Sequence, residues 1–539
     1  MHPEVDKDAS GTRTTATQVL IVGAGPTGLV LALWLTRQGV AVRIVDKTAE
    51  PGTTSRAVGV TARTLELYRQ MGLADALVAG GVKVPAVNLW VKGTRAARLP
   101  FEQMGTGLTP YPYVLVFPQD EHERLLIARL GELGVAVERQ TELVRFEQRG
   151  DGVRAILRKG DEGDGAEETC EASYLAGCDG ARSVVREALA TGFPGGTYAA
   201  VFYVADVDSE GPAANGEIHV DLDDSDFLAV FPLKQTGRVR LIGSVLEGGE
   251  PGSFTFDDVR ERASQHMKFS FRHVNWFSTY HVHHRVAASF REGRVFLLGD
   301  AAHIHSPVGG QGMNTGIGDA VNLSWKLAAV LNGGAGEAVL DSYEPERIAF
   351  ARKLVSTTDR IFTLVTKPGA VARLVRTRLA PRIAPLSFRF EAVRRFVFLT
   401  VSQIAVEYRE GPLSEGEAGE VHGGDRLPWV TVEKNAEGWA DNFAPLAALA
   451  WQAHVYGDAG EGVADVCAEL GLPLHRFAWT PATERAGLAR GATYLVRPDG
   501  YVALADADGD PERLRRYCAE HDAVLASTSR VANGTGNGG

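Results

Sequence analysis

VLIVGAGPTGLVLALWLTRQGVAVRIVD, residues 19–46, is the stretch that decides the fold of this chain. It begins with an apolar strand pattern at 19–22, continues with a helical pattern from Pro26 to Gln38, and ends in a second strand pattern at 41–45. Two parallel strands joined by a helix form a βαβ unit, and its crossover is right-handed. The stretch therefore predicts an α/β protein with a Rossmann-like parallel sheet.

Three glycines occupy the turn between the first strand and the helix. Gly23 permits the tight turn, Gly25 lets the backbone approach a pyrophosphate, and Gly28 lets the helix pack closely on the strand. Asp46 follows at about 20 residues' distance, where an acid would bind a ribose hydroxyl. The spacing and the strand–turn–helix context predict a dinucleotide-binding site.

Two further glycine-bearing segments follow apolar strands. Residues 178–186, CDGARSVVR, carry an acid, a glycine and arginines that could brace a cofactor edge, or they could form a turn capped by Asp179 or Ser183. Residues 299–314, GDAAHIHSPVGGQGMN, lead into a helical pattern, so Asp300 could accept hydrogen bonds from sugar-like hydroxyls. The free N–H groups that start this helix could face negative charge. Three such elements spread over nearly 300 residues converge on one cofactor only if it is long, which favours FAD.

Composition and charge restrict the class of protein. The 539 residues carry a net charge of −11, which argues against broad nucleic-acid binding. The four cysteines are scattered without CxxC or metal-ligand spacing. This favours a reduced, cytoplasmic protein without structural disulfides, and no metal site is expected. No stretch is long and apolar enough to span a membrane, and the first 17 residues lack an apolar signal core.

Together these residues resemble the single-component FAD-dependent aromatic hydroxylases, which are flavoprotein monooxygenases with the para-hydroxybenzoate hydroxylase fold. The motifs at 23–28, 179–186 and 299–303 occur in the family order, together with Arg56-Ala57, RTLE at 63–66 and Pro118-Gln119. The resemblance covers about residues 17–410. Beyond it, GDRLP at 424–428 and LVRPDGYV at 495–502 resemble the C-terminal domain of the phenol and polyketide hydroxylase branch.

The resemblance implies a division into domains. It implies an FAD-binding domain at 17–196 that returns, with a helical region, at 286–410. A β-rich substrate domain at 197–285 is inserted between these parts, and a thioredoxin-like domain follows at 411–533. Because this last domain has no CxxC motif, thiol redox chemistry is not expected there.

The resemblance also implies a set of cofactor-binding residues. The glycine turn and Asp46 would hold the pyrophosphate and ribose, Asp179 and Arg186 would also serve nicotinamide binding, and Pro307 would border the flavin edge near the substrate. The full set comprises Gly23, Gly25, Pro26, Thr27, Gly28, Asp46, Lys47, Arg56, Gln119, Asp179, Arg186, Asp300, Pro307, Gly310, Gly312, Met313 and Asn314.

The implied activity is hydroxylation of a phenolic or polyketide-like small molecule, as in antibiotic biosynthesis. NAD(P)H would bind transiently, reduce FAD and leave, and O₂ would react through a flavin C4a-hydroperoxide. Two alternatives stay open: the same flavin chemistry in epoxidation or Baeyer–Villiger oxidation, and a non-catalytic FAD-binding ligand sensor. The expected partners are the aromatic substrate and O₂, and the protein would be a monomer or a homodimer.

The substrate side is less well defined by the sequence. Simple phenol hydroxylases place an acid after the Arg-Ala pair, where this chain has Val58. Pro307 and His219 are the two candidate catalytic residues, and His219 would act as the base. An exposed strand histidine is the simpler interpretation of His219. Tyr113 and Phe231 are candidate substrate walls. The basic segment 367–395 is interpreted as a solvated helix face, with a membrane-surface or dimer role as the alternative.

Overall fold

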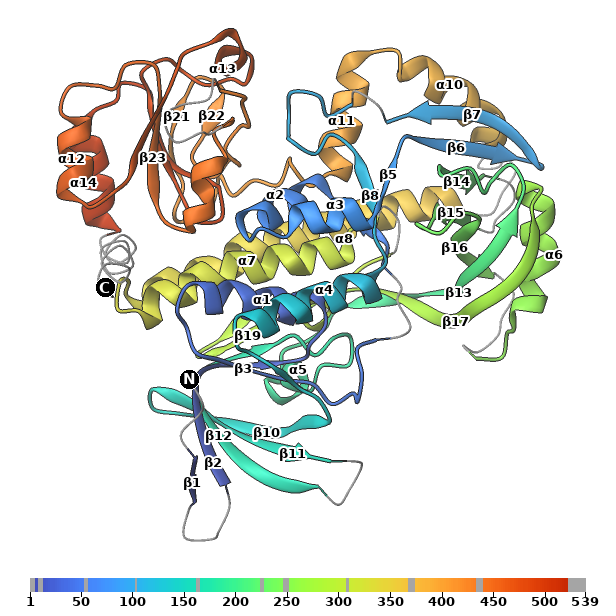
Figure 1. The fold of residues 1–539 in the computed structure, drawn as a ribbon, viewed down its shortest axis with the longest axis horizontal. Helices are drawn as coiled ribbons and strands as arrows, with labels where there is room; N and C mark the ends of the chain where they lie inside the picture. The colour runs from blue at the N-terminus through green and yellow to red at the C-terminus, as the bar shows by residue number, and fades with distance from the viewer. Residues whose placement is uncertain are drawn as a thin grey trace.

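The computed structural model describes the chain at residues 5–7, 13–52, 57–101, 104–160, 165–222, 227–245, 252–306, 310–366, 374–432 and 440–521. Its centre is a parallel sheet covered by long helices. A second large sheet lies to one side of these helices, and a C-terminal unit lies across them from the sheet (Figure 1). The predicted mixed α/β architecture is confirmed.

The central sheet has the strand order β9–β3–β2–β12–β19, with every neighbouring pair parallel. Its strands are β2 (Arg13–Val22), β3 (Val42–Val45), β9 (Val137–Glu138), β12 (Ala166–Gly177) and β19 (Val295–Leu297). The N-terminal half of β12 also pairs antiparallel with β11 (Gly152–Lys159), which pairs in turn with β10 (Thr141–Arg149). The predicted βαβ unit is present, and its apolar strand residues are buried because helices cover the sheet.

Helices α1 (Pro26–Arg37), α4 (Gln119–Glu132) and α7 (Gly312–Leu331) cover one face of the parallel sheet (Figure 1). α1 and α7 cross at very short range around Thr27. A Cβ at Gly316 would lie 2.3 Å from Thr27 Oγ1, and one at Gly299 would lie 2.6 Å from it. Because only glycines allow this approach, the first and third glycine motifs are locked together.

The second sheet has the order β20–β17–β13–β16–β15–β14–β6–β7. Its strands are β6 (Ala86–Val91), β7 (Thr94–Pro100), β13 (Gly195–Glu210), β14 (Ile218–Asp221), β15 (Leu228–Pro232), β16 (Arg238–Val245), β17 (Ser270–Val286) and β20 (His303–Ile304). The segment 197–285, predicted to be rich in strands, supplies five of them, whereas β6, β7 and β20 lie outside it. β6 joins the sheet through parallel pairing with β14. Helix α6 (Phe256–Met267) packs against β17 and closes a separate apolar core.

A small sheet of β4 (Gly59–Val60), β8 (Val114–Val116) and β5 (Val82–Val84) connects the two large sheets. Helices α2 (Ala62–Gln70), α3 (Ala74–Gly80) and α8 (Tyr343–Thr366) complete the central part. The helical region predicted within 286–410 continues after α8 as η3 (Val375–Leu379), α10 (Ala380–Ser387) and α11 (Glu391–Val401). Among the described residues, no helix is both long and apolar enough to cross a membrane.

The C-terminal unit contains a six-stranded sheet with the order β22–β21–β26–β25–β23–β24. The strands are β21 (Glu415–Ala418), β22 (Val421–His422), β23 (Gln452–Tyr456), β24 (Leu474–Phe477), β25 (Thr493–Val496) and β26 (Val502–Asp506), with helices α12 (Val463–Glu469), α13 (Pro481–Arg485) and α14 (Pro511–Glu520). Buried ion pairs join this unit to the rest: Arg497 contacts Glu346 on α8 at 2.8 Å, and Arg426 contacts Glu66 on α2 at 2.6 Å.

Candidate active site

The glycine turn before α1 has the geometry that its sequence predicts. Gly23 has a φ of +103°, and a Cβ there would lie 2.3 Å from the Cys178 carbonyl oxygen. A Cβ at Gly28 would lie 2.0 Å from the Gly23 carbonyl oxygen. At Gly25 a Cβ would meet nothing within 4 Å. The turn therefore packs tightly on two sides and leaves open space beside Gly25, at the N-terminus of a helix, where a phosphate is favoured.

Asp46 supports this turn from the end of β3. Its Oδ2 accepts a hydrogen bond from Ala24 N at 2.7 Å, and its Oδ1 accepts hydrogen bonds from Thr48 N at 2.8 Å and Thr48 Oγ1 at 2.6 Å. Arg139 Nη1 lies 3.5 Å from Asp46 Oδ1. The carboxylate is thus fixed beside the turn, whereas the adjacent Lys47 is exposed.

Gln119 and Glu123 lie on the first turns of α4, facing the loop after β3. Gln119 Nε2 donates to Glu123 Oε1 at 2.9 Å, and Glu123 Oε2 accepts from Gly52 N at 3.3 Å. Burial raises the pKa of Glu123 above its usual range. Arg56 lies outside the described residues, so its predicted role at this loop stays a prediction.

The segment 178–186 lies directly against the glycine turn. Asp179 Oδ2 accepts a hydrogen bond from Val185 N at 3.2 Å, while its Oδ1 is buried and has no partner among the described residues. Burial raises the pKa of this carboxyl. Arg186 donates to the carbonyl oxygens of Ala301 and Ala181, both at 2.9 Å. Arg186 therefore connects the second motif to the third, and Ser183 caps the short helix α5 (Val184–Ala188) as the turn interpretation predicts.

The loop 299–301 is held from behind by a buried carboxylate that sequence reasoning did not select. Asp319 on α7 accepts hydrogen bonds from Gly299 N at 3.0 Å, His303 Nε2 at 2.7 Å and Arg347 Nε at 2.7 Å. Burial alone would raise the pKa of Asp319, but Arg347 and His303 outweigh it and hold the pKa below its usual value. This anchor leaves Asp300 on the exposed side of the loop.

Asn314 joins the N-termini of α7 and α2. Its Oδ1 accepts hydrogen bonds from Thr61 N at 3.0 Å and Thr64 Oγ1 at 2.8 Å, and its Nδ2 donates to the carbonyl oxygens of Gly59 and Gly310, both at 2.9 Å. The sequence predicted a role for the backbone of Asn314, whereas the structure shows that its side chain positions both loops. Gly312 and Met313, at the start of α7, are partly exposed.

His305 lies beside the start of α7. Its Nδ1 donates to the Ser306 carbonyl at 2.9 Å, while its Nε2 lies 3.6 Å from where a Cβ of Gly312 would be. Burial lowers the pKa of His305 to about 4, so the ring is neutral at pH 7. Pro307, two residues after His305, lies outside the described residues, so the predicted place of Pro307 at the flavin edge stays a prediction.

These features fit an extended dinucleotide such as FAD. The open space beside Gly25 suits the pyrophosphate. Asp46 is held beside this turn, and Asp300 is exposed in the third motif. The buried Asp179 Oδ1 without a partner provides an acceptor for a ligand hydroxyl or an ordered water. The three glycine motifs, nearly 300 residues apart in sequence, form one connected site.

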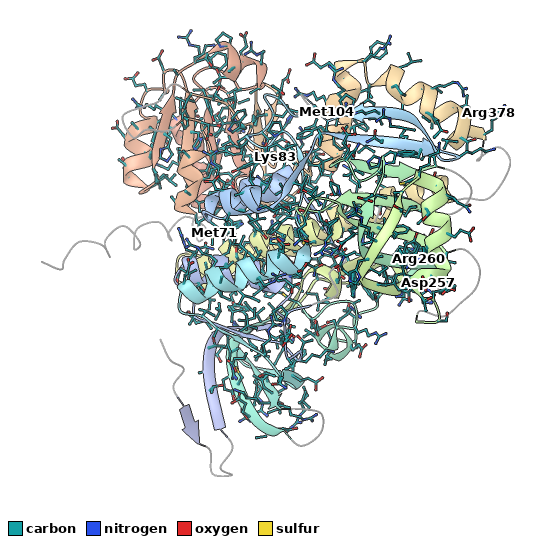
Figure 2. All side chains as sticks on the ribbon, turned by 45° about the vertical axis from the view of Figure 1, so that its right-hand side comes forward. Met71, Lys83, Met104, Asp257, Arg260 and Arg378 are labelled. Carbon is teal, nitrogen blue, oxygen red and sulfur yellow. The ribbon has the colours of Figure 1, made fainter. Side chains whose placement is uncertain are left out.

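An apolar pocket of about 30 Å³ lies between this site and α11. It combines Gly310, a predicted cofactor residue, and the neighbouring Gly59 with Tyr113 and Phe398. It is also lined by Val60, Thr61, Ala62, Phe101, Met104, Val114, Val401 and Ser402. Figure 2 shows Met104 between the C-terminal unit and the α10–α11 region. The predicted wall residue Tyr113 thus does line a pocket, and burial raises its pKa.

Phe231 and Val58 meet in a small apolar cluster next to the connecting sheet. Cross-strand from Phe231 lies Arg240, a buried residue that sequence reasoning did not select. Arg240 binds Asp206 through two hydrogen bonds of 2.6 Å and donates to the Ala57 carbonyl at 3.4 Å. It therefore links the substrate sheet to the loop after the Arg-Ala pair. The available signal was Arg240 directly before the apolar pair Leu241-Ile242 in β16.

The structure gives His219 no free nitrogen for catalysis, so this candidate is corrected. The residue is fully buried, its Nδ1 accepts from Trp90 Nε1 at 2.8 Å, and its Nε2 contacts Asn215 Oδ1 at 2.8 Å. Burial lowers its pKa to about 4. The expectation of an exposed strand histidine is also wrong, because the side chain is fully buried between Trp90 and Asn215.

Comparison with known proteins agrees with this geometry. A family model described as an FAD binding domain matches residues 16–358. The 6-methylpretetramide 4-monooxygenase of Streptomyces rimosus is 35% identical over 519 residues, which cover 90% of this chain and 90% of that protein. The rifampicin monooxygenase of Rhodococcus hoagii is 34% identical over 511 residues, covering 91% and 96%. The solved structure of the anhydrotetracycline hydroxylase OxyS from Streptomyces rimosus has a TM-score of 0.75 at 30% identity, covering 93% of this chain and 98% of that chain.

The chain therefore belongs to the FAD-binding-domain family. It is an FAD-dependent monooxygenase of the aromatic hydroxylase type, as the motifs predicted. The sensor interpretation has no support from these relatives, which are named for monooxygenase activity.

Proposed function

We propose that this protein hydroxylates an apolar, polycyclic phenol of the kind made in aromatic polyketide biosynthesis, with NAD(P)H and O₂ as co-substrates. The observation that carries the proposal is the apolar pocket between Gly59, Gly310 and α11, which adjoins the predicted flavin site. The names of the relatives, which refer to tetracycline precursors and rifampicin, support the same substrate class. Bound FAD would supply oxygen activation after reduction by NAD(P)H.

The chain's own residues would bind, orient and keep the site dry. The turn at Gly25 would receive the pyrophosphate, and the N-terminus of α7 would favour negative charge on the cofactor. The pocket lining of Phe101, Met104 and Phe398 would exclude water. A cavity of about 30 Å³ holds one or two water molecules, so side chains must move to admit an aromatic ring.

The proposal includes no carboxylate base for the substrate. Val58 stands where simple phenol hydroxylases have an acid, and it packs with Phe231 in an apolar cluster. The only ionisable side chain that lines the pocket within the described part of the chain is Tyr113, whose pKa is raised by burial, so it is neutral at pH 7. We infer that the substrate ring must be electron-rich by itself, and that the Tyr113 hydroxyl orients it by hydrogen bonding.

The C-terminal unit is proposed to be a thioredoxin-like domain that has no thiol redox role. In support, β23 is parallel to β24 across α12, β25 is antiparallel to β23, and β25 and β26 form a hairpin followed by α14. Its cysteines, Cys467 and Cys518, are buried, and burial raises the pKa of Cys467 to about 11. The predicted boundaries 17–196, 286–410 and 411–533, the cytoplasmic location and the monomer or homodimer state stay parts of this proposal.

The test is a substrate screen on the holoenzyme. NAD(P)H oxidation would be followed with single-ring phenols and with polycyclic phenols, and product masses would show whether one oxygen atom is added. We expect the polycyclic compounds to stimulate oxidation and to gain one oxygen, and Tyr113→Phe to raise KM more than it lowers kcat. Preference for small phenols, or a Tyr113→Phe enzyme with unchanged KM, would contradict the proposed substrate class and the role of Tyr113.

A further inference from the structure

The exposed apolar side chains of this protein are concentrated in one helical segment. Among the described residues, the large hydrophobic side chains that are strongly exposed all lie between residues 374 and 396: Leu374, Leu379, Ile383, Leu386, Phe390 and Phe396. Ile383 is 56% exposed and Phe396 is 70% exposed. Soluble proteins rarely cluster so many exposed hydrophobic residues without a binding partner.

The apolar residues form a stripe, and arginines form a second stripe beside it. Leu379, Ile383 and Leu386 are spaced by four and three residues around α10, which places them on one helix face. Arg378 and Arg382 each precede one residue of this stripe and are exposed as well. We call this surface of η3, α10 and the start of α11 the α10 face. Figure 2 shows Arg378 at the outer edge of the molecule, near the end of these helices.

The charge of the α10 face is opposite to that of the whole chain. Residues 374–401 contain six arginines and one acid, Glu391, whereas the net charge of the chain is −11. Within the described residues, no acidic side chain forms a salt bridge with Arg378, Arg382, Arg389 or Arg395. The arginines are thus available to an external anionic partner.

We propose that the α10 face docks the protein on the surface of an anionic phospholipid bilayer. A helix with large apolar side chains on one face and arginines beside them suits the boundary between lipid headgroups and acyl chains. A symmetric contact with a second copy would bring the two arginine stripes together, and like charges oppose this arrangement.

Docking in this orientation would bring the bilayer close to the apolar pocket. α11 has Phe396 on its outer side, while its Phe398 and Val401 line the pocket on its inner side. An apolar substrate dissolved in the bilayer would therefore lie near the pocket entrance. The docking itself does not depend on the proposed substrate, so it can fail or succeed separately.

Vesicle sedimentation of the full-length holoenzyme tests this proposal. Vesicles of phosphatidylcholine alone would be compared with vesicles that also contain phosphatidylglycerol, at increasing ionic strength. We expect binding to the anionic vesicles only, and weaker binding at higher salt. Removing two arginines with Arg378→Gln/Arg382→Gln should lower the partition coefficient about thirtyfold, from about 1 kcal/mol per arginine. Ile383→Ser/Leu386→Ser should lower it about a hundredfold.

Arg260→Gln is the matched control, because Arg260 is an exposed arginine on α6, away from the α10 face (Figure 2). It should bind vesicles like the wild type, and all variants should keep their FAD content. The proposal is overturned if the wild type does not bind anionic vesicles, or if the two double variants of the α10 face bind them as well as the control does. It is also overturned if Ile383→Ser/Leu386→Ser converts a dimer to a monomer without lipid, because a second copy then covers this face.

Discussion

Substituting two glycines of the same turn by alanine should separate cofactor binding from folding. Gly25 has a φ of −74°, which alanine adopts readily, and a Cβ there meets nothing within 4 Å. In Gly25→Ala, a gain of about 0.4–1 kcal/mol from a less flexible unfolded chain opposes an N-cap penalty of about 1 kcal/mol. The unfolding free energy of the apoprotein should therefore fall by no more than about 0.6 kcal/mol. FAD affinity should fall at least about tenfold, or about 1.4 kcal/mol, because the new methyl group occupies the space beside the turn.

Gly28→Ala is the contrasting variant. Its Cβ would lie 2.0 Å from the backbone carbonyl oxygen of Gly23, and a backbone atom cannot move away cheaply. Overpacking of this kind costs about 1–3 kcal/mol or more, which exceeds the gain of about 1 kcal/mol from replacing a helical glycine by alanine. The apoprotein should therefore unfold at a lower denaturant concentration than the wild type.

Both variants can be measured on deflavinated protein. Guanidinium chloride unfolding gives the stability, and titration with FAD, followed by flavin fluorescence, gives the dissociation constant. Wild-type FAD affinity in Gly25→Ala would refute the assignment of this open space to the pyrophosphate. A Gly28→Ala apoprotein as stable as the wild type would show that the close contact with Gly23 is not a constraint.

Three other substitutions test the surroundings of the site. Asp319→Asn should lower the unfolding free energy in urea by about 3–5 kcal/mol, because Arg347 stays buried without its carboxylate partner. A loss below about 1 kcal/mol, which is typical of exposed ion pairs, would contradict this expectation. His219→Gln should keep the pH profile of kcat. The folded pKa of about 4 lies below the unfolded value, so the wild type loses stability as pH falls from about 6.5 toward 4, and the variant should lose less. Arg240→Gln should raise the substrate KM without loss of FAD and lower stability by about 2 kcal/mol, since Asp206 keeps 18% side-chain exposure; unchanged KM would exclude a role in positioning the substrate sheet.

The cofactor side of this protein was largely predictable from the sequence. Gly23 and Gly28 occupy the positions that a strand–turn–helix element requires, and local backbone geometry depends on neighbouring residues. The order of the three glycine motifs also indicated one long cofactor. What the sequence could not indicate is how the motifs are held together, because Asp319 and Arg186 act through contacts with residues 16 to 115 positions away.

The substrate side was less predictable for a related reason. β6 joins the second sheet through pairing of Val87 with Ile218, and no pattern within either strand specifies that partner. The sequence of the strand that contains His219 is compatible with a catalytic base, an exposed residue or a core residue at that position. Only the packing of Trp90 and Asn215 around it decides that it is a buried structural residue.

The sequence by itself determined the class of fold, the cofactor type and the glycine turn, because these depend on short-range conformational preferences and motif spacing. The tertiary structure decided which side chains are buried, which loops meet, and which apolar stripe is left exposed. Burial depends on segments that are distant in sequence. The spacing of Leu379, Ile383 and Leu386 predicts a helix face, but only the folded chain shows that nothing in its described part covers that face.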